Sequence, residues 1–81
     1  MQAVRIEPDP EQFAAAGDLG RALLAAIDHL PPEQREAFLM QAEGGLTLEE
    51  IAEATAVPRE TVKSRLRYAN RRLRAVLEVS R

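Results

Sequence analysis

The 81-residue sequence contains no cysteine and a single histidine, His29. Disulfide bonds and thiolate metal sites are therefore excluded, and one imidazole cannot build a histidine-ligated metal centre. We predict no metal ion and no cofactor. We interpret His29 as part of the last turn of a helix, where a partial positive charge is favourable, and not as a catalytic group.

Long apolar runs and catalytic constellations are also absent from the sequence. No stretch approaches the ~20 apolar residues that span a bilayer, and the first residues lack the basic-then-apolar order of a signal peptide. We therefore expect a cytoplasmic protein without a membrane partner. No nucleophile lies beside a base, and Gly44 and Gly45 fit a helix stop better than a phosphate loop. The sequence thus argues against an enzyme and against a small-molecule substrate.

The charged residues are distributed unevenly, although the formal net charge is only −2. Residues 1–56 contain three basic and eleven acidic residues, a net charge of −8. Residues 57–81 contain eight basic and two acidic residues, a net charge of +6. This distribution suits a domain with one end at nucleic-acid phosphates and the other facing solvent or a protein partner.

The length allows one small domain, and no segment alternates as a strand would. We predict an all-α fold, a small bundle of four to five helices that ends in a helix-turn-helix. Residues 1–17 are predicted to be a linker or disordered segment, with a short-helix signal at Asp9. Residues 18–81 are predicted to form the helix-turn-helix domain.

Two helices are expected before the helix-turn-helix. The first begins at the candidate N-cap Asp18 and continues through apolar residues at helical spacing, namely Leu23, Leu24, Ile27 and Leu30. Pro32 suits the first turn of the second helix, which the glycine pair at 44–45 ends. Its apolar residues Phe38, Leu39 and Met40 cover more than one face. They indicate either burial between helices or an exposed partner-binding ridge.

Residues 46–73 have the pattern of a helix, a tight corner and a second helix. The Thr47 hydroxyl can accept a bond from the Glu50 amide while the Glu50 carboxylate reaches the Thr47 amide, which is a capping box. Pro58 lacks an amide proton and cannot continue that helix. A corner is therefore expected just before Pro58, and a new helix just after it.

The second of these helices has one apolar and one polar face. The predicted core stripe contains Val62, Leu66, Ala69, Leu73 and Val76, and the opposite stripe contains Glu60, Lys63, Ser64, Arg67, Tyr68 and Arg71. In a helix-turn-helix the second helix lies in the DNA major groove. The alternative is an amphipathic helix with a merely solvated polar face. The capped helix and the corner before it favour DNA recognition.

Three segments resemble region 4 of bacterial RNA polymerase sigma factors of the extracytoplasmic-function (ECF) group: LPPEQREAFLM at 30–40, GLTLEEIAEA at 45–54 and VPRETVKSRL at 57–66. They occur in the family's order and spacing, and the resemblance covers about residues 18–77. It implies a domain that recognises the −35 promoter element and docks on the flap of the polymerase β subunit. Many members of the family are held inactive by an anti-sigma factor.

The resemblance also implies a set of DNA-binding residues, namely Thr47, Arg59, Glu60, Thr61, Lys63, Ser64, Arg67, Tyr68 and Arg71. Their chemistry agrees, because Arg and Lys donate to guanine, Glu accepts from cytosine and Ser serves either role. Thr47 would lie beside backbone phosphates at a helix amino terminus. Phe38, Leu39 and Met40 are the predicted partner-binding residues.

The sequence departs from the family pattern at several positions. Ala56 stands where the family often has glycine, so a positive φ there would be strained. Tyr68 and Asn70 replace commonly basic residues, and Gln41 stands where a related arginine can reach DNA. We expect weaker binding or a different promoter preference. Region 2, which melts promoters, has no counterpart; we therefore expect a fragment beginning in the linker before region 4, with a natural stand-alone domain as the alternative.

Two other classes of binding protein fit parts of the pattern. A sigma-like mimic or adaptor would bind an anti-sigma factor or another protein without recognising DNA. Such a protein has no need to keep Lys63, Arg67 and Arg71 on one stripe, so their presence favours DNA binding. A different helix-turn-helix regulator or antitoxin needs a dimerisation element, and the short tail after Leu77 leaves little room for one.

Overall fold

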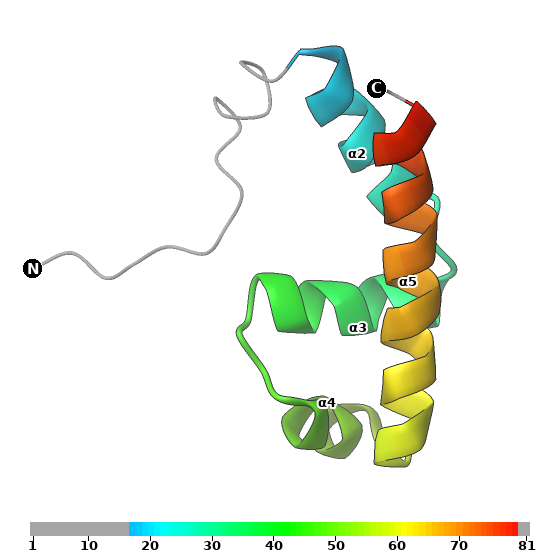
Figure 1. The fold of residues 1–81 in the computed structure, drawn as a ribbon. Helices are drawn as coiled ribbons and strands as arrows, with labels where there is room; N and C mark the ends of the chain where they lie inside the picture. The colour runs from blue at the N-terminus through cyan, green and yellow to red at the C-terminus, as the bar shows by residue number, and fades with distance from the viewer. Residues whose placement is uncertain (1–16, 80–81) are drawn as a thin grey trace, which may run out of the picture.

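This computed structural model describes residues 17–79, and this part of the chain forms four α-helices. They are α2 (Asp18–Asp28), α3 (Pro32–Ala42), α4 (Leu48–Thr55) and α5 (Arg59–Val79). No strand occurs within the described range, and the predicted all-α fold is confirmed (Figure 1). The helix signal at Asp9 lies outside the described residues.

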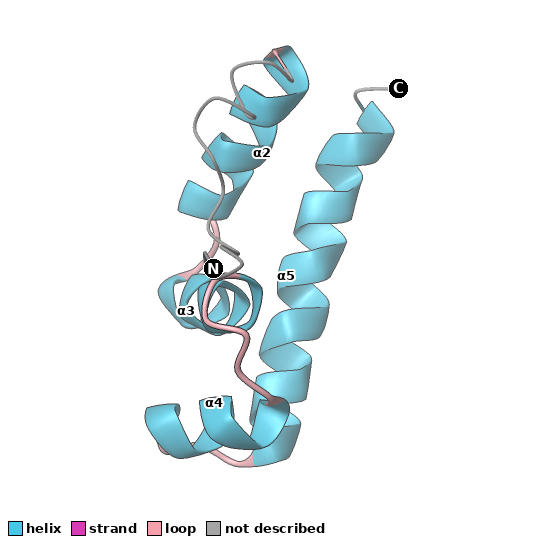
Figure 2. Cartoon of the chain, turned by 90° about the vertical axis from the view of Figure 1, so that its left-hand side faces the viewer, coloured by secondary structure: helices cyan, strands magenta, loops and turns pink. Residues whose placement is uncertain are grey.

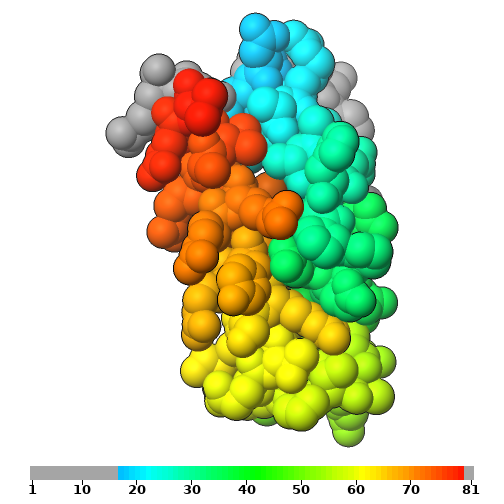
Figure 3. Space-filling view, turned by 90° about the vertical axis from the view of Figure 1, so that its right-hand side faces the viewer, coloured from blue at the N-terminus to red at the C-terminus, as the bar shows by residue number. Residues whose placement is uncertain are grey.

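Helices α2, α3 and α4 all pack against the long helix α5. Figures 1 and 2 show α2 beside the carboxyl-terminal part of α5, α3 crossing its middle and α4 beside its beginning. The space-filling view shows α5, coloured yellow to red, running up one side of the molecule towards α2 (Figure 3). Helix α4, the corner after it and the beginning of α5 therefore lie at one end of the molecule, away from α2.

The ends of α3 and α4 follow from local sequence. Thr47 Oγ1 accepts a bond from the Glu50 amide at 3.1 Å, and Glu50 Oε1 accepts one from the Thr47 amide at 2.8 Å. The predicted capping box is therefore confirmed. Helix α3 begins at Pro32 and stops before Gly44, where an added Cβ would lie 2.7 Å from the Met40 carbonyl oxygen. Only glycine fits that position.

The start of α2 differs from the prediction. Gly17 is the N-cap, with φ 68°, and Asp18 is the first helical residue and not the cap. The Asp18 carboxylate instead pairs with Arg21, one turn along. At the other end His29 follows the helix as its C-cap, as its sequence position suggested, and its Nδ1 lies 2.7 Å from the Ala25 carbonyl oxygen. Because a carbonyl only accepts, Nδ1 is the donor.

The hydrophobic core lies where α3, α4 and α5 meet. Ala37 of α3, Ile51 of α4 and Val62 and Leu66 of α5 form one buried cluster. Farther along α5, the predicted inward stripe continues with Ala69 and Leu73, both buried, and Val76, which is half-buried. The prediction for the inner face of α5 is confirmed. Helix α2 is packed less deeply, because Gly20 is its only buried residue.

Candidate nucleic-acid interface

The corner between α4 and α5 sets the direction of the second helix. Ala56 has φ 58° and ψ 41°, a left-handed backbone that no other non-glycine residue in the described range adopts. The Val57 amide donates to the Ala52 carbonyl at 3.1 Å and the Ala56 amide to that of Glu53 at 3.4 Å. These bonds form a Schellman motif, which normally has glycine at the left-handed position. Ala56 thus has the positive φ at which we expected an alanine to be strained.

Core packing then determines which face of α5 points outward. Val57, just after the corner, packs against the core cluster, and Val62 and Leu66 are buried within it. Six of the predicted DNA-binding residues on α5 are consequently exposed: Arg59, Glu60, Lys63, Arg67, Tyr68 and Arg71. Thr61 and Ser64 are half-buried. The predicted DNA-binding side chains of α5 thus share one face, with Thr61 and Ser64 closer to the core. We call this surface the outer face; it consists of residues 59, 60, 61, 63, 64, 67, 68 and 71.

Thr47, the ninth predicted residue, lies apart from α5 at the amino end of α4. Its hydroxyl oxygen caps the helix, but its hydroxyl proton can still donate to a phosphate. The Thr47 backbone amide already donates to the Glu50 carboxylate, and Glu49 adds a second carboxylate to the same turn. These charges weaken the anion-binding tendency that we expected of this helix amino terminus.

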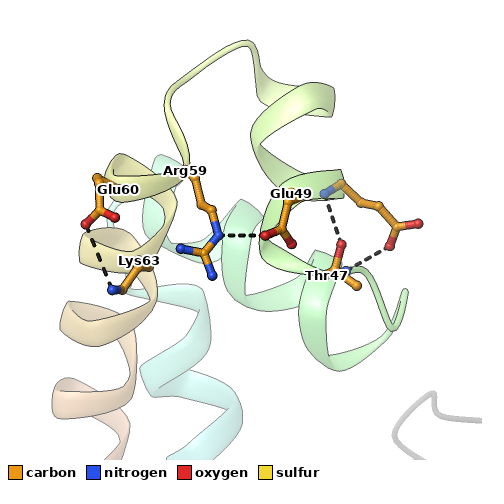
Figure 4. A network of polar contacts seen from close by, with 6 residues as sticks. Thr47, Glu49, Arg59, Glu60 and Lys63 are labelled. Atoms are coloured by element: carbon orange, nitrogen blue, oxygen red, sulfur yellow. Dashed lines mark hydrogen bonds and ion pairs between the residues drawn. The ribbon is translucent and has the colours of Figure 1, made fainter.

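Several side chains on the candidate interface are already engaged with one another. Arg59 Nε donates to Glu49 Oε2 at 2.7 Å and links α5 to α4 (Figure 4). Lys63 Nζ lies 3.9 Å from Glu60 Oε1 on the same helix. The Arg71 guanidinium carbon lies 5.6 Å from the centre of the Tyr68 ring, a cation–π contact. Arg59, Lys63 and Arg71 therefore have protein partners before any DNA is present.

Sequence reasoning missed Glu49 as a member of this interface. Its carboxylate accepts a bond from its own backbone amide at the start of α4, and the bond and positive charge of Arg59 add to that effect. Together they lower the pKa of Glu49 below the ordinary glutamate range, so the carboxylate is ionised at neutral pH. Its position in the first turn of α4 can be recognised in the sequence. Its pairing with Arg59 cannot, because it depends on the path of the corner between α4 and α5.

Basic side chains continue beyond the predicted base-facing set. Arg67, Arg71 and Arg74 line an open surface hollow along α5, together with Asn70 and Glu78. The three guanidinium groups therefore gather positive charge along this one hollow.

The predicted partner-binding residues are only partly brought together. Phe38, Leu39 and Met40 are all half-buried. Leu39 and Met40 line a shallow hollow, whose other lining residues are Pro32, Glu33, Arg35 and Glu36 of the same helix. Phe38 does not line it. Met40 also packs against the core cluster, so its side chain contributes to the core as well as to the hollow.

Among residues 17–79, no helix is both long and apolar enough to cross a membrane. The same residues contain no group of three or more side chains that could hold a metal ion.

Comparison with known proteins identifies the family. Residues 20–73, which contain α3, α4 and most of α2 and α5, match the family model described as Sigma-70, region 4. The chain belongs to the sigma-70 region 4 family. The nine predicted DNA-binding residues all lie within the matched range, whereas Arg74 of the basic hollow lies just beyond it. The resemblance predicted from three sequence segments is thereby confirmed.

Similar proteins place the chain among the ECF members of this family. It is 41% identical over 71 residues to the ECF RNA polymerase sigma factor SigE of Mycolicibacterium smegmatis, covering 88% of the chain and 28% of that protein. It is 39% identical over 67 residues to SigK of Mycobacterium ulcerans, covering 83% and 36%. It is 35% identical over 81 residues to SigK of Mycobacterium bovis, covering 96% of the chain and 43% of that protein. The chain therefore spans less than half the length of these curated relatives.

Proposed function

We propose that the chain is the promoter-recognition domain of an ECF sigma factor, which inserts α5 into the major groove at the −35 element and so directs transcription initiation. One observation carries the proposal. Val62 and Leu66 are buried against α3 and α4, and this packing turns Lys63 and Arg67 outward on an exposed face. A major groove is wide enough to admit such a helix.

The outer face offers complementary chemistry for base edges and for phosphates. Near the amino end of α5, Arg59 and Lys63 can donate to guanine, and Glu60 can accept from the cytosine amino group. Farther along, Arg71 and Arg74 in the basic hollow are placed for backbone contacts. Recognition and anchoring thus occupy successive turns of one helix.

The outward stripe of cations favours DNA recognition over a sigma-like mimic. A domain that only captured an anti-sigma factor would not need Lys63, Arg67 and Arg71 exposed together. The net charge of +6 on residues 57–81 supports the same conclusion, because this segment contains the whole of α5.

The test is equilibrium binding of the chain to duplexes selected from a random pool at low salt, followed by a salt titration. We expect a preferred sequence, with log K falling by about 0.9 per log unit of salt for each phosphate contact. A scrambled duplex of equal length is the control for non-specific binding. Absence of binding to any duplex by the folded chain would favour the mimic.

A second, protein-binding function is favoured by the hollow on α3. Leu39 and Met40 supply apolar surface there, and Glu33 and Glu36 supply an acidic border. All the lining residues belong to α3, so the hollow is separate from the outer face of α5. We propose that it receives an apolar segment of the polymerase β flap. An anti-sigma factor that competes for this hollow would block docking without touching the DNA face.

A further inference from the structure

Arg59 is the first residue of α5 and is held by a side chain of the neighbouring helix. Within residues 17–79, the other ion pairs, Asp18–Arg21 and Glu60–Lys63, join residues three apart on one helix. The pair of Arg59 with Glu49 instead joins α4 to α5 at 2.7 Å (Figure 4). It therefore fixes a side chain of the outer face relative to the body of the domain.

The geometry of the pair leaves the recognition end of Arg59 available. The bond to Glu49 uses Nε alone, so the two terminal nitrogens, Nη1 and Nη2, keep their N–H groups for another acceptor. The Arg59 side chain is still 48% exposed while it is held, so a ligand can reach it. A guanidinium presents its donors as a planar fork that matches two adjacent acceptors.

We propose that Glu49 is a positioning residue for base recognition, which aims the terminal nitrogens of Arg59 at O6 and N7 of a guanine in the major groove. The proposal rests on the proposed function and deepens it, because it assigns a guanine to one position of the DNA site. Glu49 itself touches no base.

Two physical effects make a held arginine more selective than a free one. A free Arg59 loses rotamer entropy when it binds, and Glu49 removes part of that loss in advance. The negative charge of the Glu49 carboxylate also repels phosphates. For a phosphate some distance away, it cancels the positive charge of Arg59. The pair is consequently a poor phosphate anchor and a good donor to an uncharged base edge. Glu49 lowers non-specific affinity while it raises discrimination.

The test measures the effect of one guanine nitrogen on binding by matched variants. The probes are the duplex preferred by the unmodified chain and versions in which single guanines are replaced by 7-deazaguanine, which lacks the N7 acceptor. Glu49→Gln removes the carboxylate that holds Arg59. Glu53→Gln is the control, since it removes the same charge from an exposed position one turn along α4. Matching thermal unfolding curves establish that both variants are folded.

At one guanine, we expect the 7-deaza substitution to weaken binding roughly tenfold for the unmodified chain and for Glu53→Gln. For Glu49→Gln the effect should shrink to about twofold or less, and affinity for a scrambled duplex should be equal or higher. Arg59→Ala should abolish the sensitivity to 7-deazaguanine at that guanine. The double variant with Arg59→Ala and Glu49→Gln should be equally insensitive.

Two results would overturn the inference while leaving the proposed function intact. Full sensitivity to 7-deazaguanine in Glu49→Gln would show that Arg59 needs no positioning. Tighter binding of Glu49→Gln to the preferred duplex, with its sensitivity kept, would make Glu49 a lock that holds Arg59 away from DNA. If the unmodified chain prefers no duplex at all, the proposed function fails, and the inference fails with it.

Discussion

Ala56 adopts the left-handed backbone of the α4–α5 corner although its side chain disfavours that conformation. The residue tolerates it because the Schellman bonds on either side and the packing of Val57 fix the path of the chain. A left-handed non-glycine residue costs about 1–2 kcal/mol. Some stability is therefore given up at the corner that aims α5.

Replacing Ala56 by glycine should stabilise the domain. Relief of the backbone strain is partly offset by the greater freedom of glycine in the unfolded chain, about 0.4–1 kcal/mol, which leaves a gain of roughly 0.5–1 kcal/mol. Urea unfolding followed by circular dichroism measures it. The matched control is Ala54→Gly within α4, which should lose about 1 kcal/mol. A loss at both positions would contradict the left-handed corner.

The pKa of Glu49 offers a second prediction for a single residue. Arg59→Gln should raise this pKa only part of the way to the ordinary glutamate range, because the bond from the Glu49 amide remains. Since the pKa is depressed, any stability from the pair is present above the ordinary pKa and is lost as pH falls through the lowered one. A carboxyl-carbon NMR titration measures the pKa; an identical value in both proteins would mean that the pair does not form in solution.

At the scale of elements, the packing of α5 on α4 and α3 is what presents the outer face. Leu66 is 5% exposed and belongs to the cluster that contains Ile51 and Ala37. Leu66→Ala should therefore cost about 2–5 kcal/mol of unfolding free energy. That is a large share of the ~5–15 kcal/mol typical of a whole domain. Leu77→Ala, at a position that is 44% exposed on the same helix, is the control and should cost much less. Equal losses would show that the inner face is wrongly assigned.

The helices themselves could be predicted because their signals are local. The capping box of Thr47 and Glu50 needs only four consecutive residues, and the stripe that includes Val62 and Leu66 needs only helical periodicity. The cap of α2 was assigned to Asp18 because its side chain is a good cap, yet Gly17 takes the position. Glycine is also a favoured N-cap residue, so residue preference alone does not decide between Gly17 and Asp18.

The candidate site was less accessible to sequence reasoning than the helices. The residues of the outer face follow from periodicity and from the family resemblance. The bond from Arg59 to Glu49 crosses ten positions of sequence, and it exists only because the left-handed corner brings the starts of α4 and α5 together. In the same way, Phe38 could not be separated from Leu39 and Met40 by sequence, because the division depends on how α3 lies on the core.

At the scale of the whole molecule, the fold carries two candidate surfaces on different helices. The basic face belongs to α5, and the hollow that contains Leu39 and Met40 belongs to α3. We expect an isolated β-flap fragment to shift the amide resonances of residues 33–40 and to leave most of those at 59–71 unchanged. Leu39→Ala should weaken flap binding and spare DNA binding, and Lys63→Ala should do the reverse. Shifts confined to α5 would contradict two separate surfaces.

The central claim is that the outer face of α5 recognises bases, and Lys63→Ala tests it most directly. Arg72→Ala is the matched control, because it removes the same charge from an exposed position farther along α5. The measurement compares binding of both variants to the preferred and the scrambled duplex. The account predicts that Lys63→Ala loses about 1–3 kcal/mol on the preferred duplex and most of its discrimination, whereas Arg72→Ala weakens both duplexes alike. Equal losses on the two duplexes for Lys63→Ala would show that α5 does not recognise sequence.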